Sequence, residues 1–229
     1  MRFKVLEDNN IEYLVQRTKA KSMSFTFKRD GTVVVRIPSL YTKDLANVVV
    51  NKYVDKIIER VKKKKELVAN YSNGEEFIYL GQKYKIMVVV SKHPKVIVID
   101  NVLYLYTTKD DYKTKSKIIN SWLIEKAEVI FNILLDKVFN QMKNELDQYP
   151  TLEIKKFKSV WGLCRIKKNT IALNIDLLHT DFECIEYVIC HELCHFKYPN
   201  HQKEFHEMVN RYVDEKALKG RLKTYRFKK

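Results

Sequence analysis

The spacing of apolar and polar residues predicts mostly strands in the first 108 residues. Residues 23–28 alternate between apolar and polar side chains, with the period of two of a half-buried strand. Residues 32–37 are rich in β-branched side chains, and Arg29, Asp30 and Gly31 supply turn chemistry between the two runs. We therefore expect a hairpin, within a meander of strands that one helix interrupts. The other predicted strands are residues 11–16, 77–80, 84–90, 95–99 and 102–106.

Two long helices are predicted where apolar residues recur at intervals of three and four. The first covers residues 42–70 and ends in the lysines at 62–65. The second covers residues 111–148, before Pro150, and at about 1.5 Å per residue it would be about 50 Å long, so we expect a break in it. The apolar stripe of the first helix consists of Leu45, Val48, Val49, Val54, Ile57, Ile58 and Val61.

The last third of the chain reads as short strands followed by helices. Strands are expected at residues 153–159 and 170–174, and Asp181 is a suitable N-cap for a helix that continues to about residue 196. Pro199 closes that helix, and a last helix is expected at residues 202–216. The predicted class is α+β, with a β-rich N-terminal region at 1–108 that contains one inserted helix, and a helical domain with a small flanking sheet at 109–229.

Composition adds a strong positive charge. The chain has 43 Lys and Arg against 28 Asp and Glu, a net charge of +15. Such a balance favours acidic partners, so weak nucleic-acid or nucleotide contact through the basic surface is one expectation, and a solvated lysine face that attracts only counterions is the other. Residues 219–229 interleave Tyr225 and Phe227 with basic residues, a pattern shared by nucleic-acid contacts and by solvated termini.

Cysteine usage and the first residues predict a cytoplasmic protein. Three of the four cysteines crowd into one predicted helix, which is not the spaced framework of a secreted disulfide protein. The start of the chain lacks the apolar core of a signal peptide, and no stretch approaches the roughly 20 apolar residues of a membrane span. Cys190 and Cys194 are expected to be buried apolar residues, and Cys164 to be structural.

The most specific chemical feature is the segment His191-Glu192-x-x-His195. Residues four apart on a helix share one face, so both imidazoles can point at one metal ion. Glu192 lies beside that face, where it can take a proton from water without being a ligand. Two histidines alone would be read as solvated or core residues. The Glu, the apolar flanks and a third His nearby favour a zinc site instead, since polar groups on a buried helix need a partner.

Zinc hydrolases have three protein ligands and one open position. His201 follows His195 by six residues, and Pro199 prevents the helix from continuing to it. A chain that turns at residues 198–200 could bring His201 back over the metal. His206 is a second candidate for this third ligand, although on a following helix we expect it to face elsewhere.

The ordered motifs of this region resemble one known family, the YgjP-like metallopeptidase domain, a relative of the SprT and WLM zinc peptidases. The resemblance is clearest over residues 150–213 and is carried by four segments. They are Trp161-Gly162-Leu163-Cys164, the short strand Ile171-Ala172-Leu173-Asn174, the His-Glu motif at 191–195, and the run Asn200-His201-Gln202-Lys203-Glu204-Phe205. The N-terminal layout, with Tyr79-Leu80-Gly81-x-x-Tyr84, also looks like this family.

The resemblance implies a zincin-like fold around the active helix. It also implies a zinc ion held by His191, His195 and His201, with Glu192 as general base. The chain departs from the family pattern at Val160, where family members usually have Arg, at Leu163, where they have Ser, and at His206, where they have an aromatic residue. These departures put in doubt a substrate contact by the missing Arg and leave the metal site intact.

The leading functional hypothesis is a zinc-dependent peptidase acting on a peptide or protein. In it, Glu192 accepts the proton of water and passes it to the leaving amine, and the strand at 170–174 pairs with an extended substrate. Two alternatives stay open: hydrolysis of a nucleotide phosphoanhydride, for which no Gly-rich phosphate loop is present, and a nucleic-acid-associated binding module that carries the zinc site. The sequence fixes neither the substrate nor the oligomeric state.

Overall fold

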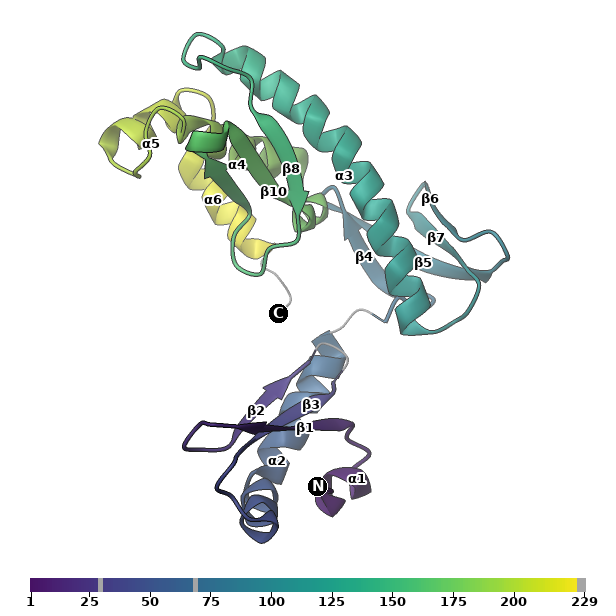
Figure 1. The fold of residues 1–229 in the computed structure, drawn as a ribbon. Coiled ribbons are helices and arrows are strands. Elements are labelled where there is room, and N and C mark those ends of the chain that lie inside the picture. The colour runs from purple at the N-terminus through teal and green to yellow at the C-terminus, as the bar shows by residue number, and fades with distance from the viewer. Residues whose placement is uncertain (29–30, 68–69, 226–229) are drawn as a thin grey trace. The chain divides into compact units, whose positions relative to one another are not determined.

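The computed structural model describes residues 1–28, 31–67 and 70–225 of the chain (Figure 1). The expected turn at Arg29 and Asp30 and the end of the basic tail lie outside these residues. The chain divides into two compact units, Met1–Ala69 and Asn70–Phe227. This division by packing falls well before the expected boundary at 108 and 109, because the second group of strands packs with the C-terminal helices. The boundary of independently folding domains stays a prediction.

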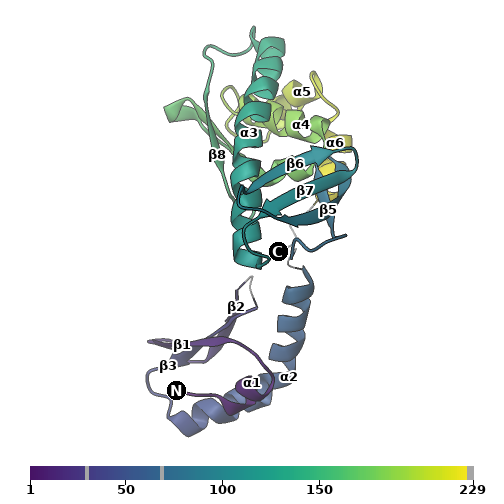
Figure 2. The ribbon, with the colours of Figure 1, turned by 90° about the vertical axis from the view of Figure 1, so that its right-hand side faces the viewer.

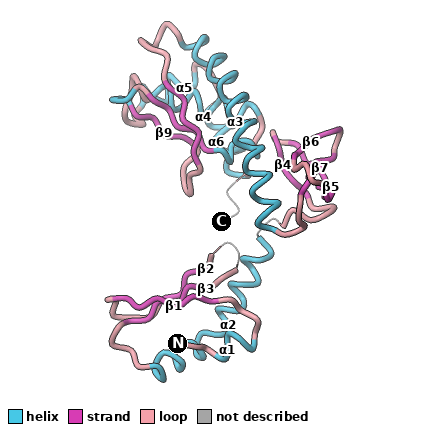
Figure 3. Tube along the Cα trace, turned by 45° about the vertical axis from the view of Figure 1, so that its right-hand side comes forward, coloured by secondary structure: helices cyan, strands magenta, loops and turns pink. Residues whose placement is uncertain are grey.

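The first unit is a three-stranded sheet packed against one long helix (Figure 3). The strand order is β1-β3-β2, with β2 antiparallel to β3, as expected for a hairpin. The strand β1, however, runs parallel to β3, so these strands are not a simple meander. The elements are α1 (Lys4–Asp8), β1 (Tyr13–Thr18), β2 (Ser24–Phe27), β3 (Val33–Pro38) and α2 (Lys43–Leu67).

The buried face of α2 differs in part from the predicted stripe. Ile57 and Val61 lie in the core as expected, but Leu45 and Val48 are exposed, and Ala46 and Val50 are buried in their place. Spacings of four and seven residues still define one helical face, so the period was correct and the face was rotated at the start of the helix. The short helix α1, whose Leu6 enters this core, was not predicted.

The second unit begins with a four-stranded sheet of order β4-β5-β7-β6. The outer pairs are antiparallel hairpins, and the central pair of β5 and β7 is parallel, which again departs from a meander. A long helix, α3, packs against the sheet and then continues past it to the rest of the unit (Figure 2). The elements are β4 (Glu76–Tyr79), β5 (Gln82–Val90), β6 (Lys95–Ile99), β7 (Val102–Thr107) and α3 (Tyr112–Met142).

Helix α3 runs unbroken, with Asp111 as its N-cap. The expected break is absent because the buried apolar residues, from Ile119 to Met142, keep to one face and join one core, although Ile124, Val129 and Ile133 are exposed. The helix ends at Met142, before the predicted end at 148. Among the described residues, no helix is both long and apolar enough to span a bilayer.

The remainder of the unit is a second small sheet covered by helices. Its strand order is β8-β10-β9, so the strand expected to pair with substrate, β10, is the central one. The edge strand β9 was not predicted. The helix expected at 202–216 is the shorter α5, and a second helix, α6, which was not predicted, covers part of the expected basic tail. The elements are β8 (Thr151–Lys155), β9 (Gly162–Arg165), η1 (Ile166–Lys168), β10 (Thr170–Asn174), η2 (Ile175–His179), α4 (Phe182–Cys194), α5 (Lys203–Asn210) and α6 (Glu215–Thr224).

The tight turn between β4 and β5 packs against the start of α4. Leu80 and Gly81 both have positive φ, at 50° and 77°, as a two-residue hairpin of type I′ requires. The Leu80 N–H donates to the carbonyl of Leu178 (2.7 Å). A Cβ on Gly81 would lie 2.9 Å from Cβ of Asp181, the N-cap of α4. The Leu-Gly pair therefore sets how closely the sheet approaches this helix.

We expect Gly81→Ala to lower the free energy of unfolding by about 2–4 kcal/mol, because a left-handed Ala is strained and its methyl group overlaps Asp181. The matched control is Gly74→Ala. Gly74 has nearly the same φ, +79°, but nothing lies within 4 Å of its added Cβ, so only about 1–2 kcal/mol of strain is expected. Urea denaturation measures both. Equal losses in the two variants would show that the contact with Asp181 does not matter.

Candidate metal centre

The helix that carries the His-Glu motif is buried and firmly capped. The Asp181 carboxylate accepts from the Cys184 N–H (2.8 Å), as the predicted N-cap should. Arg221 and Tyr225 also contact Asp181, at 3.4 and 3.2 Å, so the end of α6 is tied to the start of α4. The helix ends at Cys194, with His195 as its C-cap, which is slightly earlier than predicted. The motif therefore occupies the last turn of α4.

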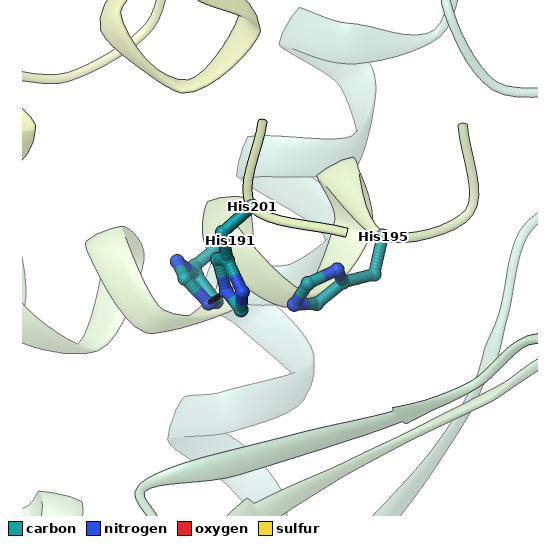
Figure 4. Close-up of side chains that lie close together, drawn as sticks. All are labelled: His191, His195 and His201. Carbon is teal, nitrogen blue, oxygen red and sulfur yellow. Dashed lines mark hydrogen bonds between the residues drawn. The ribbon is translucent and has the colours of Figure 1, made fainter. Parts of the chain in front are cut away.

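Three histidine side chains converge at this last turn (Figure 4). One ligand atom from each of His191, His195 and His201 lies within 4.8 Å of the others. The Nε2 atoms of His191 and His201 are 2.9 Å apart. Two nitrogens on a tetrahedral zinc, at about 2.0–2.1 Å each, would be roughly 3.3 Å apart. The predicted return of His201 toward the helix is thus confirmed, and the spacing is close to that of a shared ion.

The segment that returns His201 is held by hydrogen bonds and ion pairs. The His195 Nδ1 lies 3.1 Å from the carbonyl of Tyr198, so a protonated Nδ1 donates to it and leaves Nε2 free as a ligand. Glu145, just past α3, binds Lys197 (2.5 Å) and Arg211 (2.6 Å) through its two oxygens. These contacts attach both sides of the segment to one carboxylate.

Burial keeps His191 and His195 in the neutral form that binds metal. Desolvation, followed by the neighbouring rings of His195 and His201, lowers the pKa of His191 to about 3. Burial also lowers the pKa of His195. The Nδ1 of His191 is buried and has no hydrogen-bond partner among the described residues. Neutral imidazoles at His191 and His195, with the His201 ring converging on them, fit a divalent transition metal.

Glu192 lies against the edge strand β9, beside the three histidines. Its side chain is 6% exposed, and its carboxylate accepts from the backbone N–H of Cys164. A Cβ on Gly162 would lie 2.6 Å from Oε1 and 2.7 Å from Cγ of Glu192, so only glycine leaves room for this side chain. Desolvation raises the pKa of Glu192 to about 7, although the bond from Cys164 opposes the shift.

The loop before β9 is held by a buried amide. Asn174 is fully buried at the end of β10, and its Nδ2 donates to the carbonyls of Phe157 (3.1 Å) and Val160 (2.9 Å). Its Oδ1 accepts from the Asp176 N–H (3.1 Å). This amide fixes the segment that leads into Trp161 and Gly162. Val160, which stands where the family usually has Arg, has a 42% exposed side chain.

His206 does not join the three histidines. Its Nδ1 lies 2.7 Å from Oε2 of Glu215, a carboxylate that is buried at the start of α6. The other oxygen of Glu215 has no hydrogen-bond partner among the described residues. The pair attaches α5 to α6, a contact that the sequence did not indicate. The His206 ring centroid lies 6.2 Å from that of His201, but its Nδ1 is directed to Glu215.

The cysteines around the site are free thiols. Cys190 and Cys194 are fully buried, as expected for small apolar residues, and the pKa of Cys194 is raised by its contact with Cys190 and by burial. Cys164 is half-buried, and burial together with the charge of Glu192 raises its pKa to about 12. No thiol joins the histidine cluster among the described residues.

Two features of the site were missed from the sequence. The first is the contact of Gly162 with Glu192, which are far apart in the chain. The family resemblance includes the Trp-Gly segment but does not explain why a glycine is needed there. The second is the support of His195, which comes from the backbone carbonyl of Tyr198. A backbone acceptor leaves no signal in the amino-acid sequence.

Comparisons with known proteins give two kinds of result. Among solved structures, the chain is similar to the metallopeptidase zymogens jannalysin of Methanocaldococcus jannaschii and abylysin of Pyrococcus abyssi. Both are 22% identical over 41% of this chain, with 94% and 92% of their own chains covered and TM-scores of 0.37 and 0.38. A search of curated proteins finds no match.

The family comparison is much more extensive. The model of the YgjP-like metallopeptidase domain matches residues 21–225, which includes the three histidines, Glu192 and most of both compact units. The resemblance inferred from the motifs is thereby confirmed. The chain belongs to the YgjP-like metallopeptidase domain family.

Proposed function

We propose that this protein is a zinc-dependent peptidase of the His-Glu-x-x-His type. His191, His195 and His201 would hold the zinc ion, and Glu192 would act as general base. The observation that carries the proposal is the convergence of three imidazoles beside a buried carboxylate with a pKa of about 7. Three nitrogen ligands leave a fourth zinc position open, which is the arrangement of catalytic rather than structural zinc sites.

In this mechanism the zinc ion supplies Lewis acidity, which makes water more acidic and polarises the scissile carbonyl. Glu192 accepts the proton of the attacking water and delivers it to the leaving amine. Desolvation raises the pKa of Glu192, which makes its carboxylate a stronger proton acceptor. The Cys164 N–H and the space above Gly162 orient the carboxylate for these two proton transfers.

We propose that an extended substrate pairs with the outer edge of β9. This replaces the earlier expectation for residues 170–174, because β10 has β8 on one side and β9 on the other and has no free edge. The strand β9 is an edge strand that packs beside α4. One of its outward groups, the Cys164 N–H, is already used by Glu192. A substrate strand would therefore lie next to the general base.

Replacing Glu192 by Gln should lower kcat for peptide hydrolysis by about 10²–10⁴ because the proton acceptor is lost. Zinc content should stay at one ion per chain, since the ligands are untouched. Elemental analysis and assays on an unstructured protein such as casein check both statements. Parallel assays on nucleoside triphosphates test the phosphoanhydride alternative. Full peptidase activity of the Gln variant would rule out Glu192 as the base.

Replacing His201 by Ala should weaken zinc binding by at least about 100-fold. Changes to residues that only support a ligand already cost about 10–100-fold, and removing a ligand should cost more. The matched variant is His206→Gln, which should keep its zinc because His206 pairs with Glu215. Zinc per chain is measured after dialysis against a chelator of graded strength. If the Gln variant lost zinc and the Ala variant kept it, the third ligand would be His206.

Replacing Gly162 by Ala should lower kcat/KM by about 100-fold, the effect of moving a catalytic group by about 1 Å. The new methyl group would overlap the Glu192 side chain and displace its carboxylate. Zinc binding should be unchanged. Gly220→Ala is the control, because nothing lies within 4 Å of its added Cβ, and it should leave kcat/KM unchanged. Normal activity of the Gly162 variant would show that the position of Glu192 does not depend on this glycine.

A further inference from the structure

A second candidate site lies in the four-stranded sheet of the same unit. A cavity of about 770 Å³ opens between β6 and α3. It is lined from the strand by Val96, Ile97 and Val98, and from the helix by Lys117, Ser121 and Trp122, among others. None of its lining residues belongs to the metal centre. We call this cavity the β6–α3 groove. Its volume is within the range of pockets that bind ligands.

One wall of the β6–α3 groove is a sheet edge. The strand β6 is the last in the order β4-β5-β7-β6, and it pairs only with β7 in the part of the chain that the structure describes. Figure 2 shows β6 at the margin of the sheet with α3 beside it. An edge strand presents N–H and C=O groups that an added strand can use, and a helix alongside supplies side-chain contacts. This geometry suits an extended peptide.

The charges of the groove favour an acidic guest. Lys95 and Lys117 are exposed lining residues that form no ion pair with any described residue. Glu125, the acidic residue of the lining, is matched by Lys126, whose Nζ lies 3.3 Å from Oε1 of Glu125. The lining thus has an excess of positive charge. Lys95 also stands at the start of β6, where it would repel the same strand of a second copy.

The inner end of the groove is aromatic and has free donors. The rings of Tyr79 and Trp122 line the cavity with their centroids 4.7 Å apart. Neither the Tyr79 hydroxyl nor the Trp122 indole N–H has a hydrogen-bond partner among the described residues. Such rings offer apolar area together with a polar group, which suits a side chain of a bound peptide. Trp122 also gives a spectroscopic probe.

We propose that the β6–α3 groove binds an extended acidic peptide segment, which adds to the sheet as a strand beside β6. A nucleotide is the less favoured guest. The N-terminus of α3, which reaches the groove at Thr114, is the element that would bind a phosphate, but Asp111 already occupies it by accepting from the Thr114 N–H (2.9 Å). The proposal does not require that the protein is a peptidase.

The test uses the full-length protein carrying Glu192→Gln, so that bound peptide is not cleaved. The probes are a capped hexapeptide of alternating valine and glutamate and its counterpart with lysine in place of glutamate. We expect the glutamate peptide to bind at least tenfold more tightly by calorimetry. Binding should change the fluorescence of Trp122, measured with Trp161→Phe added, and should shift the amide resonances of residues 96–98.

Two further variants locate the interaction. Lys117→Glu should weaken binding of the glutamate peptide at least tenfold, and Ser121→Tyr should weaken it by filling the groove. The control is Lys143→Glu, which makes the same change of charge at the exposed C-cap of α3, outside the groove, and should weaken binding less than threefold. Equal effects of the two Glu variants, equal binding of both peptides, tighter binding of ATP, or resonance shifts confined to β9 would each overturn the proposal.

Discussion

The burial of α4 is the constraint on which the rest of this unit depends. Its apolar face forms part of the core shared with the two sheets and α3, and this fixes the last turn of the helix in space. Burying polar side chains there is unfavourable unless each has a partner. The structure meets this requirement for Glu192 with the Cys164 N–H, and for His195 with the Tyr198 carbonyl. The Nε2 atoms of His191 and His201 lie 2.9 Å apart beside His195, where a shared cation would bind both nitrogens.

The parts of the site that were predictable are those set by local geometry. Two histidines four residues apart lie on one face of any helix, and Asp181 is an N-cap wherever a helix follows it. The return of His201 could be expected from its spacing, the turn at Pro199 and the family resemblance. Its support by Glu145, which binds Lys197 and Arg211 from beyond the end of α3, could not. Ion pairs between residues so distant in sequence cannot be predicted from a local sequence pattern.

Strand pairing shows the same limit in the fold. The existence of most strands followed from their alternation, but the parallel pairs β1–β3 and β5–β7 depend on which edges remain free after the hairpins form. The edge strand β9 contains Gly162 and Cys164 and has little apolar pattern, because one of its faces is fitted to Glu192 rather than to a core. Its sequence reflects the helix α4 opposite it, so the apolar pattern alone predicts no strand there.

The two candidate sites both lie in the second compact unit, but they differ in how exposed their charged groups are. In the candidate metal centre, desolvation shifts the pKa values of His191 and Glu192, whereas the β6–α3 groove keeps Lys95 and Lys117 exposed, where charge acts over longer distances. A net charge of +15 therefore need not imply nucleic acid. Lys95 on the edge strand and Lys117 on α3 have no acidic partner among the described residues, so they attract acidic peptides. Lys95 also opposes pairing of β6 with the same strand of a second copy. The proposed peptide site shares no lining residue with the candidate metal centre, so the two can be tested by separate substitutions.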